Sequence, residues 1–139
     1  MKLILKSAIV LALIAGNSIT NKKEMKTIKA SESTAKWTGK KIGGSHTGTI
    51  DLTSGTLEFE DDKLVDGTFT IDMSSITVTD LSGENKEKLE GHLHSEEFFG
   101  TSLHPKATLL FTQVKQKSNG IYEVTADLTV KEKTHPIAF

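Results

Sequence analysis

The sequence predicts an antiparallel β-barrel or sandwich with a single helix laid across one opening. Two observations support this fold class. Apolar and polar residues alternate with period two through most of the chain after residue 30, and one charged segment, residues 88–105, interrupts that alternation. Period-two alternation is typical of strands that are buried on one face. The chain is therefore all-β with one main helix.

The first thirty residues differ from the rest of the chain. Two lysines precede the apolar run of residues 8–16, and small or polar residues follow it, as in a secretory signal peptide. The run is shorter than the roughly 20 apolar residues that a membrane-spanning helix needs. We expect residues 1–20 to be a signal peptide, residues 21–30 an exposed linker, and residues 31–139 a periplasmic or secreted domain with no membrane span after cleavage.

The charge of the predicted domain limits the classes of partner that it can bind. Residues 31–139 contain 11 lysines, no arginine and 17 acidic residues, and 11 − 17 gives a formal charge of −6. Nucleic acids and anionic membranes are bound through positive patches, so neither is expected as a partner. The chain has no cysteine, so an exported domain of this size must be stabilised by burial of its core.

We expect seven strands in an antiparallel meander, with a turn at Ser54–Gly55 and a hairpin at Asn119–Gly120. A closed barrel with a ligand-sized interior needs about eight strands. The chain stops at Phe139 within an apolar run, and we therefore expect it to be C-terminally truncated and its barrel incomplete. The predicted strands lie near residues 34–41, 45–53, 55–60, 64–74, 107–116, 121–131 and 134–139.

The helix is expected over residues 81–93. Two Glu/Lys pairs spaced i,i+4 support it, and Ser82 is a suitable N-cap residue. Leu89 and Leu93 form one thin apolar stripe, which predicts a helix lying on a surface.

Four histidines raise the alternative of a metal site: His46, His92, His94 and His104. On a helix, His92 and His94 would lie about 200° apart, so both cannot easily bind one ion. The sequence contains no Gly-x-Ser-x-Gly elbow, and its paired carboxylates lie in polar turns. We expect neither catalytic nor metal-binding residues. The alternative is a metal-dependent enzyme that uses His46 and His92.

Several short motifs occur in a characteristic order along the chain. They are Trp37-Thr-Gly-Lys40, Gly44-Ser-His-Thr-Gly-Thr-Ile-Asp-Leu52, Gly67-Thr-Phe-Thr-Ile-Asp-Met73, Lys88-Leu-Glu-Gly-His-Leu-His-Ser-Glu-Glu-Phe-Phe99, His104-Pro105, Asp127-Leu-Thr-Val130 and Thr134-His-Pro-Ile137. Together these motifs resemble the YceI-like family of polyisoprenoid-binding proteins. Two departures are visible: Glu132 stands where the family turns on glycine, and Gly100 replaces an acidic residue.

The resemblance implies an exported, lipocalin-like antiparallel barrel that holds a quinone or polyprenyl lipid, without enzymatic activity or cofactor. The head group and a homodimer are left open. In an alternative reading, the same residues form the solid core of an exported interaction module. Leu89, Leu93, Phe98 and Phe99 would close one end of the barrel. The other candidate ligand-binding residues are Trp37, Ile50, Leu52, Leu57, Phe59, Phe69, Ile71, Met73, Phe111, Tyr122, Val124 and Leu128.

Overall fold

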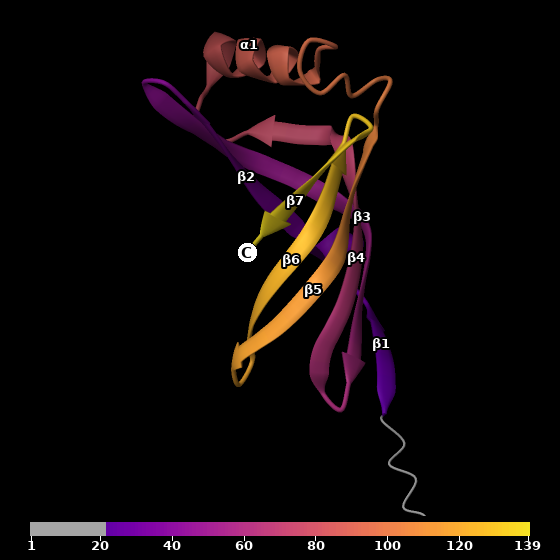
Figure 1. The fold of residues 1–139 in the computed structure, drawn as a ribbon. Coiled ribbons are helices and arrows are strands. Elements are labelled where there is room, and N and C mark those ends of the chain that lie inside the picture. The colour runs from indigo at the N-terminus through magenta and orange to yellow at the C-terminus, as the bar shows by residue number, and fades with distance from the viewer. Residues whose placement is uncertain (1–21) are drawn as a thin grey trace, which may run out of the picture.

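Two long antiparallel strands, β3 (Gly44–Glu60) and β4 (Lys63–Val78), form the middle of the computed structural model, which describes residues 22–139 (Figure 1). The turn between them places Asp61 and Asp62 at φ 48° and 62°. Positive φ at both central residues gives a hairpin turn whose twist matches that of the strands. Aspartate adopts this conformation more readily than most residues other than glycine.

The other strands extend this central pair on both sides. After β4 come β5 (Lys106–Ser118), β6 (Ile121–Val130) and β7 (Lys133–Ala138), each paired with the strand before it. On the other side, β1 (Lys23–Thr27) and β2 (Thr34–Lys41) pair with opposite halves of β3. Within the described residues β7 pairs only with β6, so the sheet stays open. This confirms the predicted all-β fold with an incomplete barrel and one main helix.

Over residues 22–139 the structure has the predicted seven strands, but the prediction of a turn at Ser54–Gly55 is wrong. The two strands expected at 45–53 and 55–60 are one strand, β3, with a register shift between Leu52 and Ser54. Gly55 lies against Phe69 of β4, and a Cβ added there would come 2.6 Å from the Phe69 ring. The glycine therefore provides room for an aromatic ring inside the sheet.

One strand, β1, was not among the predicted strands. It lies inside residues 21–30, which were predicted to be a linker. Most of its side chains are exposed, as expected for a basic segment, but its backbone pairs with β3. Lys23 forms an ion pair of 2.7 Å with Glu58, and the Lys26 ammonium lies 4.7 Å from the centre of the Phe59 ring. Pairing at a sheet edge needs no apolar alternation, so the pattern did not reveal this strand. The predicted signal peptide lies outside the described residues.

Helix α1 (Gly83–His94) lies across one end of the sheet, close to its predicted range (Figure 1). Ser82 has the extended backbone of an N-cap, but its side chain makes no capping hydrogen bond. Leu93 is buried against the sheet. The Glu90 carboxylate accepts a 2.8 Å hydrogen bond from the Val78 backbone N–H, which ties the helix to the end of β4.

The main core lies beneath this helix. Its buried residues are Ile50, Met73, Ile76, Val78, Leu93 and Ala107, surrounded by half-buried side chains that include Trp37, Phe99 and Val130. A separate aromatic cluster joins Phe69, Phe111 and Phe139, with ring centres 5.8 and 6.0 Å apart. Over residues 22–139 the structure contains no helix long and apolar enough to cross a membrane.

Candidate apolar binding cavity

An apolar cavity of about 280 Å³ lies between the sheet and the helical end of the molecule. Strands β2 and β6 are far apart in the strand order, yet both contribute to its wall, so the open sheet curls around the cavity. The residues that line it are Trp37, Thr38, Gly39, Ile50, Ile71, Met73, Ile76, Leu93, Phe98, Phe99, Ala107, Leu128 and Val130.

Half of the predicted ligand-binding residues line this cavity: Trp37, Ile50, Ile71, Met73, Leu93, Phe98, Phe99 and Leu128. Leu89 lines an adjacent pocket of about 290 Å³, which shares Trp37, Leu93 and Phe98 with the cavity. The helix and the segment after it therefore contribute all four side chains that were predicted to close one end. Whether these residues contact a ligand stays a prediction.

The structure places the other seven candidates elsewhere: Leu52, Leu57, Phe59, Phe69, Phe111, Tyr122 and Val124. Phe69 and Phe111 pack on each other in the separate aromatic cluster that also contains Phe139. The Tyr122 hydroxyl accepts a 3.2 Å hydrogen bond from the Leu64 N–H. Leu52 borders a polar pocket together with two aspartates. Period two assigned all of them to one continuous face, but the register shifts in β3 and β5 divide that face.

Three apolar wall residues were missing from the prediction: Ile76, Ala107 and Val130. Ile76 and the buried Val78 form an alternating pair around Thr77, a signal that was present in the sequence. Ile76 and Val78 were missed because the fourth strand was expected to end near residue 74, whereas β4 continues to Val78.

The segment that follows α1 covers part of the cavity and is fastened to the β6–β7 hairpin. The Lys131 ammonium donates hydrogen bonds to the backbone carbonyls of Glu96 and Phe98. Phe98 and Phe99 pack edge to face with ring centres 4.6 Å apart, and both line the cavity. Phe98 is 44% exposed, so the cover is open to solvent on its outer side. Lys131 therefore acts as a clamp on this cover.

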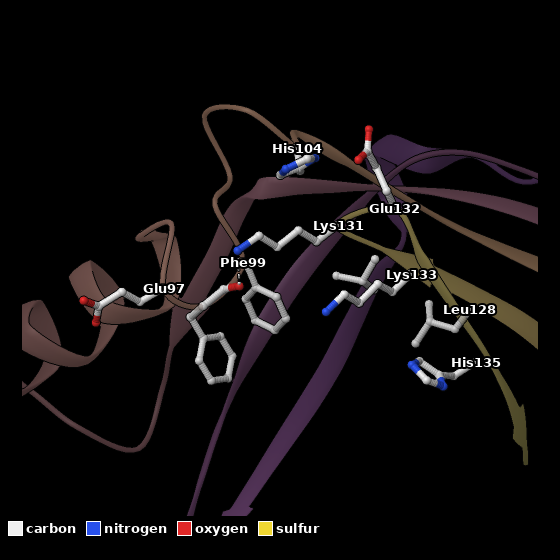
Figure 2. A pocket seen from close by; sticks show the side chains of 10 residues that line it. Glu97, Phe99, His104, Leu128, Lys131, Glu132, Lys133 and His135 are labelled. Atoms are coloured by element: carbon white, nitrogen blue, oxygen red, sulfur yellow. Dashed lines mark hydrogen bonds between the residues drawn. The ribbon is translucent and has the colours of Figure 1, made fainter.

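A larger pocket of about 610 Å³ adjoins the cavity and shares Phe98, Phe99, Leu128 and Val130 with it. Figure 2 shows charged side chains of both signs around this pocket, with Lys131 beside Phe99. Its ionisable residues are Glu97, Glu132, Lys131, Lys133, His104 and His135. The apolar cavity thus meets solvent through a rim of mixed charge.

Two of the four histidines considered as metal ligands, His46 and His94, form hydrogen bonds within the protein. The His46 Nδ1 lies 2.9 Å from the Asp80 Oδ2, and the Thr47 N–H donates to the other Asp80 oxygen. The hydrogen bond from His46 holds the pKa of Asp80 below its ordinary value. His94 shares a 2.9 Å hydrogen bond with Thr101. Among residues 22–139, no three His, Asp or Glu side chains gather as metal ligands would.

A comparison with known proteins identifies the family of this chain. The family model of the YceI-like domain matches residues 27–139. A UPF0312 protein of Pectobacterium atrosepticum is 35% identical over 80 residues, which are 52% of this chain and 41% of that protein. The protein YceI of Shigella flexneri is 32% identical over 83 residues, covering 54% of this chain and 43% of the relative. The matched segments thus span less than half of each relative.

Proposed function

The chain belongs to the YceI-like family, and on that premise we propose that it is an exported, non-enzymatic carrier of a long-chain polyisoprenoid lipid. The lipid chain occupies the apolar cavity and extends into the pockets that adjoin it. Phe98 and Phe99 lie over the chain, and Trp37 lies beside it at the β2 wall.

The observation that supports this proposal is the lining of the cavity. Apart from Thr38 and Gly39, every residue that forms its wall has an apolar side chain. Its volume of about 280 Å³ lies near the lower end of small-molecule sites, which span roughly 300–1,000 Å³. Shared wall residues connect it to two further pockets, so a long and narrow ligand has room on both sides.

Burial alone can hold such a ligand. Each CH₂ group that leaves water contributes about 0.8 kcal/mol, and a prenyl chain contains many of them. These contributions can exceed the cost of ordering the chain and of losing its translational freedom. A site of this kind needs volume and apolar walls rather than a catalytic motif.

Trp37 makes the proposal directly testable, because it is the only tryptophan in the chain and lines the cavity. We expect its fluorescence to change saturably when geranylgeraniol is added to the protein. Val130→Phe should narrow the cavity and weaken this binding about tenfold or more, equivalent to roughly 1.4 kcal/mol. Val65→Phe makes the same substitution at an exposed site outside the cavity, and should leave the binding unchanged.

Two other outcomes would favour other classes of function. A protein that shows no saturable response would contradict the carrier and favour an exported interaction module. Stoichiometric metal in the purified protein, with hydrolytic activity that is lost in His46→Ala and His92→Ala, would favour a metal-dependent enzyme.

A further inference from the structure

We propose that the pocket between β2 and α1 is a subsite for an oxyanion head group of the bound lipid, such as a phosphate ester. This inference rests on the proposed carrier function, because a lipid head group lies in this pocket only when its chain is bound in the cavity. It adds the chemical class of the ligand and the end of the cavity at which the head group lies.

The first support is the lining of this pocket, whose volume is about 290 Å³. Its floor is apolar and includes Trp37, Leu93 and Phe98, which also line the cavity. Its polar side chains are Lys40, Lys41, His46 and His92, and none of the described residues that line it carries a carboxylate. A chain leaving the cavity in this direction therefore meets two lysines and two imidazoles, and no carboxylate in the lining.

The pocket on the other side of the cavity differs in charge. There, Glu97 and Glu132 stand among the lysines and histidines, so the rim carries both positive and negative groups. The predicted domain also carries an overall charge of −6. The carboxylate-free lining beside β2 is therefore a local exception in an acidic protein, and it distinguishes the two ends of the cavity.

The second support is that both oxygens of the Asp80 carboxylate are already engaged. The His46 Nδ1–H donates a 2.9 Å hydrogen bond to Oδ2, and the Thr47 N–H donates to Oδ1. Because Nε2 of this neutral ring is an acceptor, the oxyanion is bound by the two lysines and not by His46. Asp80 offsets one of the two positive charges of Lys40 and Lys41, so the subsite keeps a net charge of +1 with neutral histidines.

This arrangement matches an oxyanion chemically. A lysine ammonium offers three donors and no acceptor, and its hydrogen bonds to charged oxygens are roughly twice as strong as neutral ones. His92 packs against Phe98 with ring centres 5.5 Å apart, which holds the second imidazole at the same pocket. A neutral hydroxyl head group would gain less from the same side chains.

The test compares three probes by Trp37 fluorescence: geranylgeranyl phosphate, geranylgeraniol and inorganic phosphate. We expect the phosphate ester to bind about tenfold more tightly than the alcohol, because its bonds to lysine are charge-assisted. The double variant Lys40→Gln/Lys41→Gln should remove this preference while keeping the affinity for the alcohol. Lys115→Gln/Lys117→Gln, which removes two lysines outside the pocket, should retain the preference.

The outcomes separate the subsite from the carrier function. Equal affinity for the ester and the alcohol, or a preference that survives in Lys40→Gln/Lys41→Gln, would overturn the subsite and leave the carrier intact. Inorganic phosphate that binds as tightly as the ester would overturn a lipid as the source of the oxyanion. A protein that binds neither prenyl compound would refute the carrier itself, and with it this inference.

Discussion

Gly48 of β3 lies directly opposite Trp37 of β2, and the indole occupies the space that a side chain at Gly48 would need. A Cβ at Gly48 would come 2.6 Å from the Trp37 ring and would also collide with the Thr77 carbonyl oxygen. That same carbonyl accepts a 3.0 Å hydrogen bond from the Trp37 Nε1–H. The absence of a side chain at one position thus fixes the aromatic wall of the cavity.

Gly48→Ala should therefore destabilise the protein by about 3 kcal/mol, because overpacking forces the ring or the backbone to move. Urea unfolding measures this change in the free energy of unfolding. Gly91→Ala is the matched control, since a Cβ there meets nothing within 4 Å and α1 should gain up to about 1 kcal/mol. Equal effects of the two substitutions would show that the indole does not occupy this space.

The β6–β7 turn offers a stabilising substitution. Lys131 and Glu132 have φ values of 49° and 63°, so the hairpin forms although no glycine is present. A left-handed backbone costs a residue other than glycine about 1–2 kcal/mol. Glu132→Gly should raise the free energy of unfolding by about 1 kcal/mol. Gly120→Ala, at φ 75° in the preceding hairpin, should lower it by a similar amount, and the account is wrong if both changes act in the same direction.

Lys131 should control the mobility of the cover over the cavity. Lys131→Met keeps an unbranched side chain but removes the hydrogen bonds to the carbonyls of Glu96 and Phe98. We expect faster amide hydrogen exchange at Gly100, whose N–H bonds to Ser95 within that segment, and faster release of a bound lipid. Lys133→Met removes a neighbouring charge without such bonds. Unchanged exchange at Gly100 in Lys131→Met would show that the clamp has no role.

The His46–Asp80 pair predicts a pH dependence at the acidic end. The pKa of Asp80 is lowered from its ordinary value of 3.8, chiefly by the hydrogen bond from His46. A depressed folded-state pKa gives stability that is present above pH 3.8 and is lost as pH falls through the folded value. Asp80→Asn should therefore reduce the extra stability at pH 5 and flatten its loss toward pH 3. Parallel profiles for the wild type and the variant would contradict the pairing.

The fold class could be predicted because period-two alternation survives in most strands. The prediction of strand ends from this alternation failed where a strand is irregular. At Ser74 the backbone N–H bonds to the Asp72 carboxylate, and the Ser75 hydroxyl bonds to the Asp72 carbonyl. The register of β4 against β3 shifts here, so alternation breaks and then resumes at Ile76. A bulge looks like a strand end in the sequence, and two buried core residues were lost from the prediction for that reason.

The candidate site was predictable in part. Leu93, Phe98 and Phe99 were expected at one end because a short helix and an apolar pair interrupt the strands, and Trp37 was chosen from a predicted strand. Phe69 and Phe111 were chosen from strands in the same way as Trp37, yet they pack together away from the cavity. Period two reports which face of a strand is apolar. It does not report how a curled sheet divides that face into separate clusters.

The central claim is that the cavity holds an isoprenoid lipid, and native mass spectrometry of the protein purified from an exporting host tests it most directly. We predict a species heavier than the protein by the mass of one lipid, which organic extraction releases and identifies as a prenyl compound. Val130→Phe should lose that species, and Val65→Phe should keep it. A protein that is repeatedly lipid-free, and that takes up no prenyl chain when one is added, would contradict the account.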